Sequence, residues 1–306
     1  MNSDTIKYFR ENPGRLVSAL GSKGYLNWMP DKLYLQIVGS ASLGYKLNLD
    51  NPRTFNEKLN WLKLHDRKPE YTRMVDKYAV REYIAEKIGE QYLIPLVGGP
   101  WDSFEEIDFS SLPEQFVLKT THDSGGVVIC RNKANFDMEA ARQKLTWHLK
   151  REYFWGKREW PYKNVKPRII EEAYLEDKET QELRDYKFFC FGGKVKALFI
   201  AEDRQGDEET KFDFFDADFH HLDIRNGHPN ASVPPEKPLS FEKMKEMAER
   251  LSQGIPHLRV DFYEANGKIY FGELTFSHWS GFTPFEPEEW DLKFGEWLKL
   301  PLKKLP

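Results

Sequence analysis

Two short glycine turns in the second half of the chain constrain its fold more than any other feature. Gly192-Gly193 separates two largely apolar runs at 185–191 and 194–201. Asn266-Gly267 separates a second pair of such runs, at 258–263 and 269–276. Such dipeptides typically join neighbouring antiparallel strands, because Gly and Asn tolerate the left-handed backbone of tight hairpin turns. The sequence therefore predicts an antiparallel sheet built from hairpins.

Helical patterns accompany these hairpins. Thr54 precedes an amphipathic run, and Glu57 lies three residues after Thr54. This spacing is a capping-box pattern. Ser240 is expected to cap a later helix. The helices predicted from apolar periodicity after the first one are 76–86, 138–155 and 240–253. Helices and antiparallel hairpins in one chain predict the α+β class.

Composition narrows the function classes. The 306 residues carry a formal net charge of −4, which does not suit a general nucleic-acid binder. The two cysteines, Cys130 and Cys190, exclude a disulfide-rich scaffold and a four-cysteine zinc site. The N-terminal residues lack an apolar signal core, and no run approaches the ~20 apolar residues of a membrane span. We expect a cytoplasmic protein without a membrane span.

One polar loop is a candidate phosphate site. Lys119 ends a predicted strand, and the loop Thr120–Gly126 then contains His122 and a Ser-Gly-Gly sequence at 124–126. Backbone N–H groups of such a loop can approach phosphate oxygens, and the lysine adds positive charge. An ordinary hairpin connection explains the same residues, and the spacing of a Walker loop is absent.

A second candidate site lies on the last hairpin. Arg259 and Asp261 share one strand face, and Glu273 and Thr275 share a face of the next strand. The two sets meet only if the turn at Asn266-Gly267 has three residues and a bulge; a two-residue turn places them on opposite faces. Converging carboxylates suit Mg²⁺, but an ion-paired sheet face is an equal alternative.

Taken together, five ordered stretches resemble the ATP-grasp superfamily, and more closely its TupA-like branch, which is associated with bacterial polysaccharide biosynthesis. The resemblance runs from about residue 55 to residue 282. The stretches are FNEKLNWLKLHDRKPEYTRMVDKYAVREYI, YLIPLVGG, FVLKTTHDSGG, DYKFFCFGGKV and RVDFYEANGKIYFGELTF.

The resemblance implies an ATP-grasp fold in which two α+β subdomains enclose a nucleotide cleft. It implies a helical segment at 1–75, a subdomain with the phosphate loop at 76–165, and a subdomain with the magnesium site at 166–306. The ATP contacts that it implies are Lys77, Lys119, His122, Ser124, Gly125, Gly126, Glu171, Glu172, Tyr174, Leu175 and Asp185.

The same resemblance implies catalytic roles for Arg259, Lys119 and Lys187, and magnesium ligands at Asp261, Glu273 and Thr275. One position departs from the family pattern. Thr275 stands where an asparagine is usual, and a hydroxyl is a weaker metal ligand than an amide carbonyl.

The implied activity is an ATP-dependent carboxylate–amine ligation with ATP and Mg²⁺. Its expected partners are a sugar acid or glycan acceptor and an amino acid or amine, in association with polysaccharide-assembly enzymes. Aromatic residues at 153–162 and in the tail from Phe276 to Trp290 are candidates for an acceptor groove, although core or subdomain-interface packing explains them as well.

Three rival functions stay open on sequence. A glycosyltransferase would use a D-x-D motif, for which Asp216-Ala-Asp218 has the spacing. An ATP-dependent phosphotransferase would leave its product phosphorylated. A nucleotide-sensing module would bind without turnover.

Overall fold

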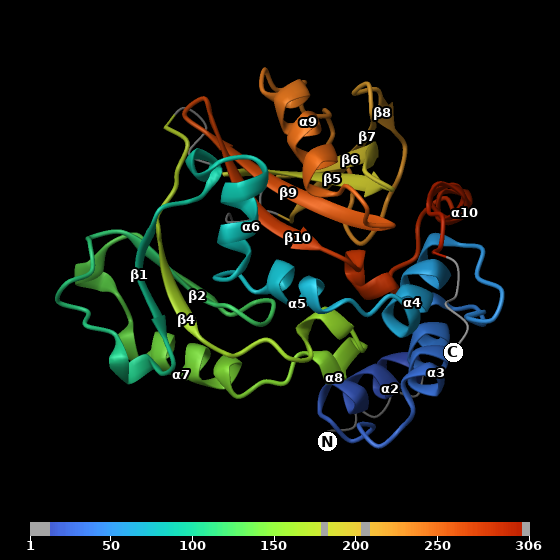
Figure 1. The fold of residues 1–306 in the computed structure, drawn as a ribbon, viewed down its shortest axis with the longest axis horizontal. Coiled ribbons are helices and arrows are strands. Elements are labelled where there is room, and N and C mark those ends of the chain that lie inside the picture. The colour runs from blue at the N-terminus through green and yellow to red at the C-terminus, as the bar shows by residue number, and fades with distance from the viewer. Residues whose placement is uncertain (1–12, 179–182, 203–208, 302–306) are drawn as a thin grey trace.

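The computed structural model describes residues 13–178, 183–202 and 209–301, which form two antiparallel sheets flanked by helices (Figure 1). This architecture confirms the α+β class. The first sheet has the order β1-β4-β2-β3 and consists of β1 (Leu96–Trp101), β2 (Phe116–Thr120), β3 (Val127–Cys130) and β4 (Ile169–Ala173). The second sheet has the order β10-β9-β5-β6-β7-β8. Its strands are β5 (Arg184–Phe191), β6 (Lys194–Glu202), β7 (Lys211–Asp216), β8 (His221–Leu222), β9 (His257–Ala265) and β10 (Lys268–Thr275).

The α-helices of the described residues are α2 (Pro13–Ser22), α3 (Asp31–Leu43), α4 (Phe55–His65), α5 (Pro69–Val75), α6 (Val80–Lys87), α7 (Met138–Leu149), α8 (Phe154–Lys157), α9 (Phe241–Leu251) and α10 (Glu289–Trp297). The 3₁₀ turns are η1 (Glu90–Tyr92), η2 (Phe104–Glu106), η3 (Lys133–Asn135), η4 (Trp160–Tyr162) and η5 (His278–Gly281). The capping box at Thr54 and Glu57 is present at the start of α4, as predicted.

Three helix predictions need correction. α6 begins at Val80 rather than at Asp76, because the Asp76 carboxylate accepts backbone hydrogen bonds from Tyr78 and Ala79 in a preceding turn. The helix expected at 138–155 is two helices, α7 and α8. The Ser240 hydroxyl does not cap α9; it donates to the Glu264 carboxylate instead.

The second sheet is covered on both faces, which explains why its strands read as nearly continuous apolar runs. On one face, Leu258, Val260 and Phe262 of β9 pack against α9 in a fully buried cluster, as the strand alternation predicts. On the other face, Phe189 and Phe199 pack with residues of α4 and α10. This face, which packs against α4 and α10, is aromatic around Phe189 and Phe199. Farther along the same face the residues are charged and include Arg259 and Asp261.

The first sheet packs its own apolar core against α7, around Phe116 and Leu118 of β2. α5 and α6 lie between the two sheets (Figure 1). β4 follows residue 165, where the boundary between the two subdomains is expected, yet it pairs with β1 and β2 of the first sheet. The chain enters the second sheet only after Ala173. In the described part of the chain, no helix combines the length and apolar character that crossing a bilayer requires.

Candidate active site

A cavity of about 620 Å³ lies between the sheets. Its walls come from β2 and β4 of the first sheet, from β5, β9 and β10 of the second, and from α6. Residues that the sequence nominated line much of it: Lys77, Lys119, Ser124, Gly125, Glu172, Tyr174, Leu175, Asp185, Lys187 and Glu273. The fold therefore gathers side chains from five separate parts of the chain around one space.

The phosphate-loop candidate has a buried base and an exposed tip. Asp123 is fully buried and bonds to the Thr120 hydroxyl and the His148 ring. Ser124 and Gly125 are exposed at the cavity wall, where Gly125 has a φ of +91°. A Cβ at Gly126 would lie 1.7 Å from the Thr120 hydroxyl oxygen, so this position requires glycine. The anchored base leaves the backbone of the tip available to an anion.

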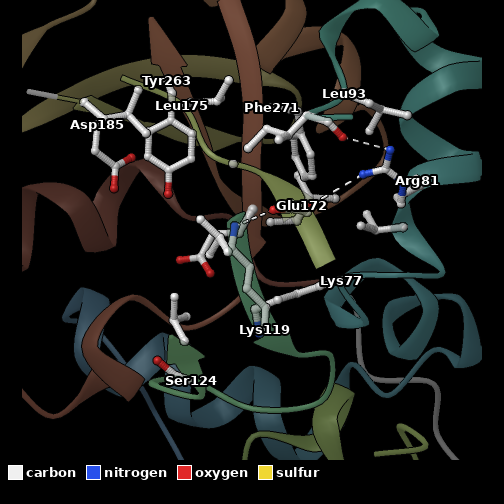
Figure 2. A pocket seen from close by; sticks show the side chains of 18 of the residues that line it. Lys77, Arg81, Leu93, Lys119, Ser124, Glu172, Leu175, Asp185, Tyr263 and Phe271 are labelled. Atoms are coloured by element: carbon white, nitrogen blue, oxygen red, sulfur yellow. Dashed lines mark hydrogen bonds and ion pairs between the residues drawn. The ribbon is translucent and has the colours of Figure 1, made fainter. Parts of the chain in front are cut away.

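Cations and one carboxylate meet beside this loop. Lys119 on β2 pairs with Glu172 on β4 at 2.5 Å, and Arg81 of α6 approaches the other oxygen of Glu172 at 3.5 Å, as Figure 2 shows. The Lys77 ammonium donates to the carbonyl oxygen of Asp123, and burial lowers its pKa. Sequence reasoning missed Arg81, although the helix predicted over 76–86 would place it one turn after Lys77. In the structure Lys77 lies in the turn before α6.

The last hairpin resolves the two alternatives left open by its turn. The turn has two residues, since Lys268 pairs with Ala265, so the hypothesis that the two sets meet only across a three-residue turn is wrong. A register shift between Phe271 and Glu273 instead places Glu273 opposite Asp261. The bulge thus occurs within β10, at Gly272, and brings both carboxylates to one face.

Arg259 forms ion pairs with both carboxylates of this charged face. Its guanidinium donates two hydrogen bonds to the Asp261 carboxylate, at 2.8 and 2.7 Å, and one to Glu273 at 3.0 Å. Lys187 also pairs with Asp261, and with Asp185 at 2.6 Å. Burial alone would raise the pKa of Asp261, but the Arg259 and Lys187 cations outweigh it and hold that pKa below its usual range.

A buried histidine, His278, forms a hydrogen bond with Arg259. Nη1 of Arg259 donates to Nδ1 of His278 at 2.9 Å, so Nε2 carries the ring hydrogen and donates to Oδ1 of Asn226 at 2.7 Å. Burial, together with the Arg259 charge, lowers the pKa of His278, which keeps the ring neutral. The sequence offered no signal for this contact, because His278 lies nineteen residues from Arg259.

The residues present fit a magnesium ion that shares its coordination with a nucleotide. Mg²⁺ is commonly held by one or two carboxylates together with substrate phosphates. The Glu273 side chain is 44% exposed and lines the cavity, with the Asp261 carboxylate beside it. Among the described residues, no group of three or more His, Cys, Asp or Glu side chains forms a complete metal-binding set. The phosphates would therefore be needed to complete the coordination.

The far end of the cavity is apolar. Tyr174 and Leu175 line it as predicted, together with side chains that the sequence did not single out: Met74, Val80, Leu93, Ile94, Val117, Ile129, Leu183, Tyr263 and Phe271. Most of these apolar residues lie in strands and helices, where a core residue and a cavity wall have the same pattern, and Leu93, Ile94 and Leu183 lie in connecting segments. A polar end and an apolar end in one cavity suit a nucleotide, with phosphates at one and a base at the other.

Some nominated residues do not line this cavity. Glu171 is fully buried on the opposite face of β4, and both of its carboxylate oxygens are buried without a described hydrogen-bond partner. His122 is buried at the base of the loop, where Nε2 bonds to the carbonyl oxygens of His148 and Arg151. Gly126, Arg259, Asp261 and Thr275 do not line the cavity either, and the Thr275 hydroxyl donates to Glu273 at 3.3 Å.

The D-x-D sequence lies elsewhere. Asp216 ends β7, and its carboxylate accepts hydrogen bonds from the backbone N–H groups of Asp218 and His220 in a tight turn. The side chain of Asp218 is 79% exposed. Neither residue lines the cavity between the sheets.

The fold and the cavity between two sheets define an ATP-grasp protein, and the sequence matches the model of one family, described as TupA-like ATPgrasp, over residues 57–299. The chain belongs to this TupA-like ATP-grasp family. No curated protein matches its sequence significantly.

Similar solved structures are distant. D-alanine–D-alanine ligase from Bacillus anthracis complexed with ATP is 14% identical with a TM-score of 0.39, and the match covers 66% of this chain and 55% of that one. L-amino acid ligase from Bacillus licheniformis is 15% identical with a TM-score of 0.42, covering 68% and 44%. ATP-grasp ligase PsnB complexed with minimal precursor, Mg and ADP is 12% identical with a TM-score of 0.37, covering 69% and 53%. The chain thus spans about half the length of these proteins, between 44% and 55%.

Proposed function

We propose that this protein is an ADP-forming carboxylate–amine ligase acting in the synthesis of a capsular or cell-wall polysaccharide. Its carboxylate substrate is a sugar acid or amino acid, and its other substrate is an amine. The observation that carries the proposal is the single cavity in which Lys77, Lys119 and the loop tip face Glu273 across the gap between the sheets. The polysaccharide role follows from the family branch that the sequence resembles.

Each group has a proposed task. Lys77, Lys119 and the backbone of Ser124-Gly125 bind the ATP phosphates, and Asp185 and the segment with Tyr174 and Leu175 bind the nucleoside. Glu273, with the Asp261 carboxylate beside it, would hold Mg²⁺, and the ion would offset phosphate charge as a Lewis acid. Lys187 lines the cavity and stabilises the charge that develops on the transferred phosphoryl group, and Arg259 acts through its hydrogen bonds to Glu273 and Asp261.

The proposed reaction has two steps. In the first, a substrate carboxylate oxygen bonds to the γ-phosphorus of ATP, the bond from that phosphorus to the β,γ-bridging oxygen breaks, and ADP leaves with an acyl phosphate formed. In the second, the amine nitrogen bonds to the acyl carbon, the carbon–oxygen bond to phosphate breaks, and the amine releases its proton to solvent. The products are an amide, ADP and inorganic phosphate.

The test is ATP turnover by the full chain with panels of sugar acids, amino acids and amines. We expect release of ADP and phosphate, and a hydroxamate when hydroxylamine replaces the amine. Lys119→Met should abolish both signals, whereas Lys166→Gln, an exposed lysine paired with Asp102, should leave them unchanged. ADP without phosphate would instead identify a phosphotransferase, turnover of a nucleotide sugar without ATP a glycosyltransferase, and ATP binding without turnover a sensor.

A further inference from the structure

The turn that follows β10 has a strained backbone. Within η5, Trp279 has a φ of +46° and Ser280 a φ of +57°, and Gly281 then has a φ of +62°. Glycine adopts this left-handed region freely, but the Cβ atom of any other residue makes it unfavourable. Two such residues in succession persist only where neighbouring groups hold them in place, and strain of this kind gathers near functional sites.

Two buried charged residues hold Ser280 in this conformation. The Lys63 ammonium, from α4, donates to the carbonyl oxygen of Ser280 at 2.7 Å. Its other two hydrogens go to the carbonyl oxygen of Lys157 at 3.0 Å and to Oδ1 of Asn60 at 2.9 Å, so all three are used. The Ser280 hydroxyl donates to the Glu159 carboxylate at 2.6 Å. Both the backbone and the side chain of Ser280 are therefore fixed.

The end of the turn lies against the same helix. Nδ2 of Asn60 donates to the carbonyl oxygen of Gly281 at 2.8 Å. A Cβ at Gly281 would lie 2.8 Å from that nitrogen and 3.1 Å from the Cβ of Leu59. α4 and the segment after β10 thus lie side by side (Figure 1).

Lys63 and Glu159 are opposite charges in the interior. They are 3% and 4% exposed, and neither lines the cavity between the sheets. Burial lowers the pKa of Lys63 and raises that of Glu159, and the charge of each opposes the shift of the other. Buried opposite charges add little net stability, but removal of one is costly, so together they favour a single arrangement of the groups around them.

The start of the turn leads to the charged face of the second sheet. His278 lies two residues before Ser280, and its Nδ1 accepts from Nη1 of Arg259 at 2.9 Å. Arg259 also donates to Glu273 at 3.0 Å. The charge of Arg259 lowers the pKa of Glu159, so the two ends of this path are within electrostatic reach of each other.

We infer that Lys63 and Glu159 are positioning residues for the magnesium–nucleotide site. They keep Ser280 left-handed, this conformation directs His278 toward Arg259, and Arg259 then holds Glu273 at the cavity. The helical segment before Lys77 thereby contributes to the reaction. The inference rests on the proposed function, because only there does Glu273 contact a metal and a nucleotide.

Two variants of one residue isolate the strain. Ser280→Ala and Ser280→Gly both lose the hydroxyl that donates to Glu159, but only glycine occupies a φ of +57° without strain. Lys63→Met removes the other anchor. Thr54→Ala, at the start of the same helix, is the control, because it weakens α4 away from the turn.

The first measurement is the histidine ¹H–¹⁵N NMR spectrum of the full chain without nucleotide. The His278 resonances are identified by their loss in His278→Gln. In wild type we expect a neutral ring whose Nδ1 accepts a hydrogen bond. Ser280→Ala and Lys63→Met should shift this Nδ1 resonance, whereas Ser280→Gly and Thr54→Ala should leave it in place.

The second measurement is a titration of the full chain with fluorescent mant-ADP over a Mg²⁺ series. Ser280→Ala should weaken the Mg²⁺-dependent binding about tenfold, the scale expected when one strained residue is no longer held. Ser280→Gly should recover most of this loss, and Thr54→Ala should bind as wild type does.

An unchanged Nδ1 resonance in Ser280→Ala would overturn the inference, as would equal losses of binding in Ser280→Ala and Ser280→Gly. If Lys63→Met does not fold, the two Ser280 variants decide alone. Hydroxamate formation together with normal mant-ADP binding by Ser280→Ala would keep the ligase and reject the positioning role. Weakened mant-ADP binding by Ser280→Ala, recovered in Ser280→Gly but without hydroxamate from any acid, would keep the positioning role and reject the ligase.

Discussion

Asp261 and Glu273 are neighbours on one sheet face, yet they lie in different surroundings. Asp261 is buried and accepts hydrogen bonds from Arg259 and Lys187. Glu273 has one described cationic partner and is partly exposed at the cavity. Asp261 thus stabilises the positions of the two cations, and Glu273 is the carboxylate that a magnesium ion could reach first.

We therefore predict that Glu273→Gln lowers kcat for ADP formation by about 100-fold, the range reported for loss of one preorganised electrostatic contact, and raises the Mg²⁺ concentration needed. The measurement is a coupled ADP assay over a Mg²⁺ series. Glu246→Gln, on the exposed side of α9, is the matched control. Unchanged turnover of Glu273→Gln across the series would exclude a metal role for this residue.

Glu171 is a buried acid without described partners for its oxygens. Burial raises its pKa above the usual value. A raised pKa means that the folded state binds the proton more tightly than the unfolded state, so this residue lowers stability as pH rises through the window above its unfolded pKa.

Glu171→Gln removes that ionisation. We predict that its free energy of unfolding exceeds that of wild type by roughly 1 kcal/mol at pH 8, and that the difference shrinks toward pH 5. Urea denaturation at the two pH values is the measurement, with exposed Glu114→Gln as control. A difference that grows as pH falls would contradict the sign.

At the scale of elements, one bulge determines the composition of the charged face. With its two-residue turn, a regular hairpin would pair Glu273 with Val260, whose side chain packs under α9. The extra residue at Gly272 shifts the pairing so that Glu273 faces Asp261. A Cβ at Gly272 would lie 3.0 Å from the Asp261 carbonyl oxygen, so a glycine suits this close approach.

The start of α4 is determined locally. Thr54 accepts from the N–H of Glu57, and the Glu57 carboxylate accepts from that of Thr54. We predict that Thr54→Ala destabilises the protein by about 1 kcal/mol. Chemical denaturation measures this loss, and Thr54→Ser, which keeps the hydroxyl, should recover most of it. Equal destabilisation by both variants would locate the effect in the methyl packing instead.

At the scale of the whole molecule, a ligand bound in the cavity between the sheets would raise the free energy of unfolding. A nucleotide that touches both sheets binds the folded state and not the unfolded one. At about 100 times its Kd, such a ligand adds about 2.7 kcal/mol to the free energy of unfolding.

We predict that ATP with Mg²⁺ raises the midpoint of thermal unfolding by several degrees, as about 2–4 °C per kcal/mol in proteins of 150–250 residues implies. Differential scanning fluorimetry measures the shift. Lys119→Met should lose most of it, because this lysine lies at the polar end of the cavity. A wild-type midpoint insensitive to ATP would contradict the nucleotide site.

The sequence by itself determined the elements that depend on neighbours in the chain: the capping box of α4, the hairpin turns, the buried face of β9 and the loop between Lys119 and Val127. It also carried the resemblance that nominated most of the cavity's polar residues. Periodicity and turn chemistry are local properties, so they can be read without coordinates.

Only the tertiary structure decided the bulge at Gly272, the contact of His278 with Arg259 and the burial of Glu171. Each depends on segments far apart in the chain being packed together. Which face a side chain finally occupies, and whether a neighbour satisfies its hydrogen bonds, is set by that packing and not by the pattern of residues along the strand.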